Sequence, residues 1–164
     1  MLSAHFDVNE FDGDAPIPPA CLPVLTDLCE QVLEPTRAQF GVPLEITSGY
    51  RPPLANAEAH GQPNSEHIYT PAWCAADFVV NGVSPRAVFD WMRNNSSLPY
   101  HQLILEHGQN STVIHVSVNK LEPGVRSVLE GATHNAVPYI KVDHVDYAPP
   151  SNHDDVQDAA AGES

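Results

Sequence analysis

The chain has 164 residues, of which 42% are hydrophobic and 17% charged, proportions typical of one compact domain with a real core. Lysine and arginine total 7 against 21 aspartate and glutamate residues, a formal net charge of -14, so few groups could displace counterions from DNA or RNA. No run of about 18 apolar residues occurs. The composition therefore speaks against a nucleic-acid partner and against a membrane span.

The two ends of the chain support expectations about location and domain limits. The N-terminus has no basic region followed by an apolar run, so we expect no export signal and a cytoplasmic location at synthesis. After Tyr147 come two prolines and then mainly Asp, Ala, Gly and Ser, which offer little to bury. We expect one folded domain over residues 1–148, a disordered acidic tail over 149–164, and a monomer.

Hydrophobic spacing predicts the elements in chain order. Residues 1–18 are expected to form an irregular arm whose Phe6 and Phe11 dock on the core. A long helix is expected over 19–40, with Pro35 as a kink. A strand at 44–48 and a short helix at 54–60 follow.

The second half is richer in strands. A strand is expected at 75–80, a helix at 85–94 with Ser84 as its N-cap, and a hairpin of strands 101–106 and 112–118 around a turn at 107–110. One more short strand is expected near 126–129. Helices packed on a small, mostly antiparallel sheet predict an α+β fold.

Cysteine chemistry is not prominent. The chain has three cysteines, Cys21, Cys29 and Cys74, an odd and sparse set that forms neither a disulfide framework nor a paired thiolate zinc motif. We expect them to be reduced core residues.

One set of polar residues stands out because its members come from separate loops and strands. His67 lies in a polar loop, whereas Asp77 and His115 lie in otherwise apolar strands, where an acid and a base need partners. A zinc ion would satisfy all three, since two imidazoles and a carboxylate leave a fourth position for water and lower its pKa to roughly 7. The full set that could converge is Arg51, Ser65, His67, Asp77, Glu106 and His115. Spacing alone equally allows a hydrogen-bonded core histidine at 115 and a capping acid at 77.

Four motifs resemble, in order, the zinc D-Ala-D-Ala carboxypeptidase family, from about Phe6 to Lys120. They are Ser48-Gly49-Tyr50-Arg51-Pro52-Pro53, Asn64-Ser65-Glu66-His67, Ala75-Ala76-Asp77, and Gln102-Leu103-Ile104 with Val113-Ile114-His115-Val116-Ser117. The long helix before the first motif is also similar.

The resemblance implies the hedgehog/DD-peptidase fold and hydrolysis of D-amino-acid peptide bonds in peptidoglycan stems. On matched positions, His67, Asp77 and His115 are the zinc ligands. Arg51 contacts the substrate carboxylate or carbonyl, a role that suits a permanently charged, bidentate donor. Ser65, with Tyr50 and Gln102, is expected to support the ligands or the substrate.

The sequence departs from the family pattern at the carboxylate ligand. The family Asp usually follows the first His by seven residues, but Cys74 stands at that place and Asp77 comes ten residues after His67. The simplest account is a three-residue insertion within 68–74. Cys74 stays an alternative soft ligand, although a Cys at a strand entrance is more often buried filler.

The second departure concerns the general base. Many relatives place an acid three residues before the final His, where this chain has Thr112. Glu106 is the leading replacement, with His107 and Glu66 as alternatives. If the hairpin pairs Glu106 with Ser111, Glu106 lies roughly 13 Å along the strand from the residue opposite His115, at about 3.3 Å per residue, which is too far for direct action.

The sequence thus favours a zinc metallopeptidase acting on peptidoglycan, as carboxypeptidase or endopeptidase, and a phage or prophage endolysin that reaches the wall after lysis or holin release, or as part of a virion. The alternative is a virion or tail-associated module that binds wall peptide without turnover, motivated by Thr112. A hedgehog-like structural domain without metal is the weakest interpretation.

Overall fold

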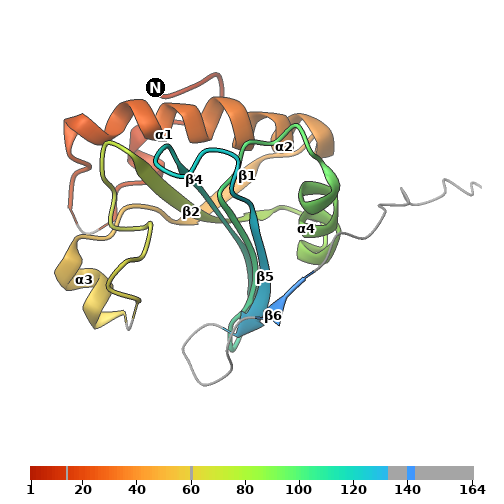
Figure 1. Ribbon diagram of the computed structural model, residues 1–164. Coiled ribbons are helices and arrows are strands. Elements are labelled where there is room, and N and C mark those ends of the chain that lie inside the picture. Colours follow the sequence, from red (N-terminus) through yellow and green to blue (C-terminus); the bar gives the residue numbers. More distant parts are fainter. Residues whose placement is uncertain (14, 60, 133–139, 143–164) are drawn as a thin grey trace, which may run out of the picture.

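The computed structural model describes residues 1–13, 15–59, 61–132 and 140–142. Its centre is a sheet of six strands in the order β1-β2-β4-β3-β5-β6 (Figure 1). All neighbouring pairs are antiparallel except β3 and β5, which are parallel. The strands are β1 Leu44–Ser48, β2 Trp73–Val80, β3 Gln102–His107, β4 Thr112–Asn119, β5 Ser127–Ala132 and β6 Ile140–Lys141.

The long helical segment crosses one face of this sheet (Figure 1). It consists of α1 Leu22–Leu28, a π-helical turn Cys29–Leu33, and α2 Glu34–Phe40. Pro35 has no N–H to donate to the preceding turn, and the π turn ends just before it, where Glu34 N–H bonds to the Cys29 carbonyl. At Pro35, where a kink was expected, the structure therefore has a change of helical pitch. Gly41, with φ of 67°, ends the helix.

Successive side chains along each strand point to opposite faces of the sheet. On β2, Cys74, Ala76 and Phe78 belong to the core beneath the helices, so Ala75 and Asp77 point to the opposite face. On β4, Ile114, Val116 and Val118 join the same core, which turns His115 to the face of Asp77. Helix α4, Pro85–Asn94, adds Val88, Phe89 and Met92 to the core.

The N-terminal arm packs behind the end of β1. Phe6 and Phe11 are 1% and 0% exposed, which confirms that the arm docks through its aromatic residues. Tyr50 N–H donates to the Phe11 carbonyl at 2.8 Å. A Cβ on Gly49 would lie 2.5 Å from the Phe11 carbonyl oxygen, so only glycine permits this approach.

Most expected elements are confirmed, and several details are corrected. The short helix α3 runs from Pro53 to Glu58, and β5 is longer than expected and pairs in parallel. Ser84 precedes α4, but among the described residues its side chain makes no capping hydrogen bond, so proline at the first position remains the start signal. Strand β6 was not expected. The expected tail over 149–164 lies outside the described residues.

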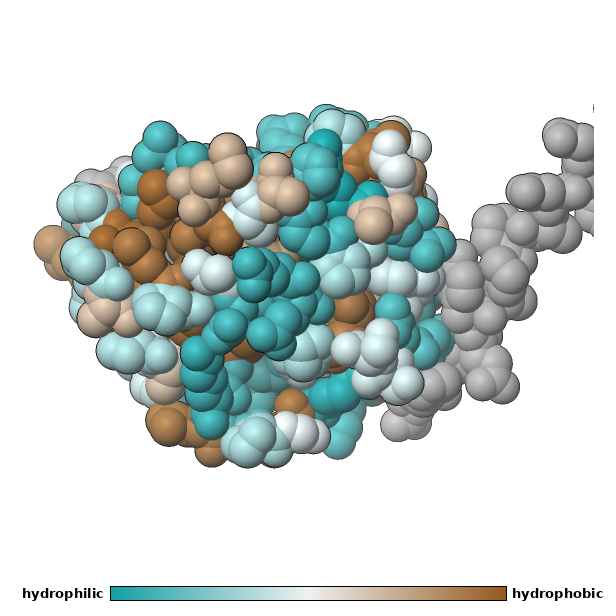
Figure 2. Space-filling model, turned by 90° about the horizontal axis from the view of Figure 1, so that it is seen from above, coloured by the Kyte–Doolittle hydropathy of each residue, from teal (hydrophilic) through white to brown (hydrophobic). Residues whose placement is uncertain are grey.

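Seen from above the helices, the surface is largely hydrophilic, and apolar residues gather toward the end at which α1 begins (Figure 2). Within the described part of the chain, no helix has both the length and the apolar character needed to cross a bilayer.

Candidate metal centre

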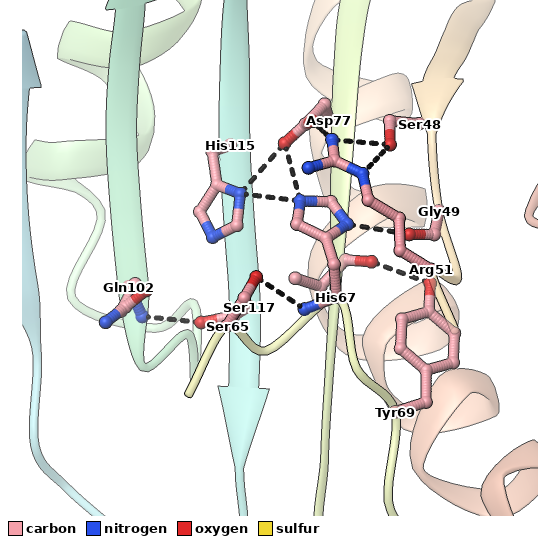
Figure 3. A network of polar contacts seen from close by, with 11 residues as sticks. Ser48, Gly49, Arg51, Ser65, His67, Tyr69, Asp77, Gln102, His115 and Ser117 are labelled. Atoms are coloured by element: carbon pink, nitrogen blue, oxygen red, sulfur yellow. Dashed lines mark hydrogen bonds and ion pairs between the residues drawn. The ribbon is translucent and has the colours of Figure 1, made fainter. Parts of the chain in front are cut away.

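Three buried side chains from different elements meet on the face of the sheet opposite the helices (Figure 3). Asp77 on β2 and His115 on β4 are direct partners across the antiparallel ladder, so their side chains emerge side by side. His67 comes from the loop between α3 and β2. The exposed fractions of His67, Asp77 and His115 are 3%, 6% and 5%.

Their nearest polar atoms form a tight triangle. His67 Nε2 lies 3.1 Å from Asp77 Oδ1 and 3.2 Å from His115 Nδ1, and His115 Nδ1 lies 2.8 Å from Asp77 Oδ1. In a tetrahedral zinc site with bonds of about 2.0–2.1 Å, neighbouring ligand atoms are about 3.3 Å apart. The triangle therefore needs only a slight expansion to hold zinc.

One hydrogen bond orients the His67 ring. His67 Nδ1 lies 2.6 Å from the Gly49 carbonyl, which can only accept, so Nδ1 donates and Nε2 is the ring nitrogen that faces Asp77 and His115. A metal ion at this point would be bound by Nε2, and Gly49 would orient the ring as metal-bound histidines require.

The pKa shifts agree with this crowding. Burial alone would raise the pKa of Asp77, but His67 and His115 outweigh burial and hold that pKa well below its usual value. Burial also acts to lower the pKa of His115, yet the hydrogen bond and charge of Asp77, followed by the charges of Glu106 and Glu66, raise it. Asp77 is therefore an ionised carboxylate, as a metal ligand must be.

Arg51 holds the second oxygen of Asp77. Its Nη2 lies 2.9 Å from Asp77 Oδ2 and 2.7 Å from Ser48 Oγ, and its Nε also donates to Ser48 Oγ at 3.0 Å. A register shift between Ile46 and Ser48 places Ser48, rather than Thr47, opposite Asp77. This bulge turns Ser48 toward the site. The Arg51 side chain is 28% exposed.

The other expected site residues surround this centre. Ser65 Oγ accepts the His67 backbone N–H at 3.3 Å. The Tyr50 ring packs on Tyr69, and Tyr50 borders a pocket of about 380 Å³ together with Arg51 and Ser48. Gln102 starts β3 on the face of His115, and its backbone N–H donates to Ser117 Oγ at 3.0 Å.

Cys74 does not join the metal centre. It is 0% exposed, lies among the core residues on the helix side of β2, and its thiol donates to the Val24 carbonyl at 3.5 Å. Three positions separate it from Asp77, an odd number that places the two side chains on opposite faces of the strand. The alternative of a Cys74 ligand is therefore wrong.

The hairpin register differs from the one used to judge Glu106. The structure pairs Glu106 with Val113 and Ile104 with His115, because the loop of the hairpin spans residues 108–111 rather than the expected 107–110. Glu106 is thus two residues, or about 7 Å along the strand, from the residue opposite His115, and on the same face. The expected 13 Å separation is wrong, and the geometric objection to Glu106 falls with it.

The two alternative bases are placed less well. His107 follows Glu106, so it points to the other face, where its Nε2 bonds to Glu130 at 2.9 Å. Glu66 is 7% exposed, and its carboxylate already binds His101 and Asn119.

Two supporting groups were missed by the sequence analysis, namely Ser48, which anchors Arg51, and the Gly49 carbonyl, which orients His67. Both lie in the quoted Ser-Gly-Tyr-Arg motif, so the signal was present. A backbone carbonyl and a bulge-directed hydroxyl cannot be assigned a role from spacing alone.

A comparison with protein families matches residues 5–117 to the model described as Peptidase M15. The match includes His67, Asp77 and His115. A comparison with curated proteins finds no match.

Proposed function

The chain belongs to the peptidase M15 family, whose members are metal-dependent peptidases, and on this basis we propose that it uses zinc to hydrolyse D-Ala-containing peptide bonds of peptidoglycan. The observation that carries the proposal is the convergence of three ligating atoms from His67, Asp77 and His115 within a buried cluster. Two imidazoles and one carboxylate are a donor set typical of catalytic zinc, because they leave one coordination position for a reactant.

Bound zinc would supply Lewis-acid chemistry, polarising a peptide carbonyl and making water a nucleophile near neutral pH. The residues of the chain supply the rest. His67, Asp77 and His115 would hold the ion. Arg51 bonds to Asp77, and its partly exposed side chain borders the 380 Å³ pocket, so it would bind a substrate carboxylate or carbonyl beside the ligands.

We assign the general base to Glu106. Glu106 lies two residues from Ile104, which pairs with His115, and on the same face of the sheet. From there its carboxylate would reach the region in front of the ligands. There it would take a proton from the attacking water and pass it to the leaving amine. Thr112 cannot do this, since a hydroxyl does not accept a proton near neutral pH.

The remaining sequence-based residues would act around this step. Ser65 would hold the backbone of His67, and Tyr50 and Gln102 would line the approach of the stem peptide. We further propose that the protein is a phage or prophage endolysin that acts as a monomer on the cell wall, after lysis or holin release or as part of a virion.

The experiment is release of D-Ala or stem fragments from purified peptidoglycan, with and without chelator. We expect release that stops on chelation and returns with zinc. Glu106→Gln should lower the rate at least about 100-fold while one equivalent of zinc stays bound. His107→Gln, which changes the neighbouring residue on the other face, is the matched control and should stay within a few-fold of wild type.

A second function is tested by the same assay. Thr112 stands where many relatives have an acid, and this difference favours a virion or tail-associated module that binds wall peptide without turnover. Stoichiometric zinc with no release at several pH values would support that module and contradict the peptidase.

A further inference from the structure

A second buried polar cluster lies beside the metal centre, formed by residues to which we have given no chemical step. His101 stands between two carboxylates, with Nδ1 2.9 Å from Glu66 Oε1 and Nε2 2.7 Å from Glu122 Oε2. Asn119 Nδ2 donates to Glu66 Oε1 at 3.0 Å. The side chains of His101 and Glu66 are only 11% and 7% exposed.

Each ring nitrogen of His101 thus faces a carboxylate oxygen, so the ring bridges Glu66 and Glu122 with both of its nitrogens. The backbone of His101 is fixed as well. Its N–H donates to the Ser117 carbonyl at 2.7 Å, and its carbonyl accepts from Ser127 N–H at 2.8 Å.

Glu66 immediately precedes the ligand His67. Residues 59–72 contain no helix or strand among those described, so tertiary contacts decide where His67 stands. Its backbone and Nδ1 have three such contacts, to the Gly49 carbonyl, to Ser65 Oγ and to the Arg51 backbone N–H, while Nε2 faces Asp77 and His115 in the metal centre itself. The first three contacts join His67 to its own loop and to the segment after β1. Next to His67, the Glu66 carboxylate binds His101, which directly precedes β3, and Asn119 at the end of β4.

We propose that His101 is a positioning residue of the metal centre, which holds Glu66 against the end of β4 and thereby sets His67 in register with Asp77 and His115. A buried carboxylate that loses its hydrogen-bond partner is costly, so loss of the His101 ring would drive Glu66 toward water. Because Glu66 and His67 are adjacent, that movement would displace the ligand. The inference rests on the metal centre of the proposed function and not on peptide hydrolysis.

The test compares His101→Leu with wild type by zinc affinity, measured by chelator competition, and by the visible spectrum of the cobalt-substituted protein. We expect zinc to bind about 10-fold more weakly and the cobalt bands to change in intensity, since both report ligand geometry. His101→Arg keeps several hydrogen-bond donors and should restore most of the affinity.

The matched control is His5→Leu. His5 Nδ1 lies 2.7 Å from Glu34 Oε2, so this change also removes a histidine–carboxylate pair, but on the N-terminal arm. It should leave zinc affinity and the cobalt spectrum unchanged. A purely structural role for His101 would lower the unfolding midpoint of His101→Leu without moving either metal readout, and would overturn the proposal.

Zinc affinity within twofold of wild type and an unchanged cobalt spectrum in His101→Leu would overturn the proposal. So would a failure of His101→Arg to restore the affinity. If His101→Leu does not fold, Glu122→Gln is the second variant, because it weakens only one of the two contacts of His101 and changes a side chain that is 56% exposed. It should give a smaller loss of zinc affinity than His101→Leu. No loss would again overturn the proposal. Should the protein bind zinc yet release nothing from peptidoglycan, the proposed function fails while these metal measurements still decide the role of His101.

Discussion

At the scale of single residues, the site depends on which atom of each side chain is already engaged. His67 uses Nδ1 to hold the Gly49 carbonyl and therefore has only Nε2 left for a metal. Asp77 offers Oδ1 to the imidazoles and gives Oδ2 to Arg51. His67 and Asp77 thus each have a fixed second contact, the arrangement that orients ligands and tunes a metal.

Arg51 gives the first prediction at this scale. Lysine keeps the charge but cannot contact Ser48, Asp77 and a substrate oxygen together. We expect Arg51→Lys to lower kcat/KM for a D-Ala-D-Ala stem peptide about 100-fold, while zinc content stays at one equivalent. Arg86→Lys, at an exposed ion pair with Glu130, is the control and should change kcat/KM little. Loss of zinc together with activity would instead assign Arg51 to holding Asp77 alone.

Cys74 gives a prediction of the opposite kind. Its thiol is buried in the core, and burial raises its pKa well above the usual range, so it is a neutral thiol rather than a thiolate ligand. We expect Cys74→Ala to keep wild-type zinc affinity and to lose about 1–2 kcal/mol of unfolding free energy in urea, through the small cavity it leaves. A clear fall in zinc affinity would return Cys74 to the metal site.

At the scale of elements, a bulge in one strand and the register of one hairpin determine which side chains face the site. The bulge in β1 turns Ser48 toward Asp77, and the register of the β3–β4 hairpin brings Glu106 toward His115. The strands themselves were predictable from alternation, since β1 has the expected bounds and β2 and β4 differ only at their ends. The register was not, because a loop that lies one residue further along the chain shifts every partner in the ladder by two residues.

The close approach behind β1 gives a prediction for this element. A Cβ at Gly49 would lie 2.5 Å and 2.6 Å from the carbonyl oxygen and Cα of Phe11, which are backbone atoms and cannot turn aside. We expect Gly49→Ala to cost about 1–3 kcal/mol or more in unfolding free energy and to weaken zinc binding, since the Gly49 carbonyl orients His67.

Gly124→Ala is the matched control for that change. Gly124 has φ of 80° and open space around it, so alanine there meets only backbone strain, worth about 1 kcal/mol. Zinc affinity should be unchanged. Equal effects of the two variants on zinc binding would contradict the role given to the end of β1.

At the scale of the whole molecule, one sheet separates a core from a chemical face. The long helical segment and α4 cover the face that carries Phe78 and Ile114, and the opposite face carries Asp77 and His115. The family motifs allowed the ligand set to be predicted from the sequence. The supporting contacts of Gly49, His101 and Glu66 could not be, because they depend on how loops far apart in the chain meet the sheet.

Metal binding should be visible in global stability. A ligand present at about 1,000 times its Kd adds about 4 kcal/mol to the folded state. For a chain of this size that corresponds to a rise in Tm of roughly 10 °C. We expect zinc to raise the Tm of the wild type in a calorimetric scan against a chelator-treated sample, and to have little effect on His115→Ala. A similar rise in both proteins would place the ion elsewhere.

The most direct test of the account is X-ray absorption at the zinc edge on the protein loaded with one equivalent of zinc. The account predicts two imidazoles and oxygen donors at about 2.0–2.1 Å, no sulfur at about 2.3 Å, and the loss of one imidazole in His67→Ala. A sulfur ligand, or a zinc environment that His67→Ala leaves unchanged, would contradict it.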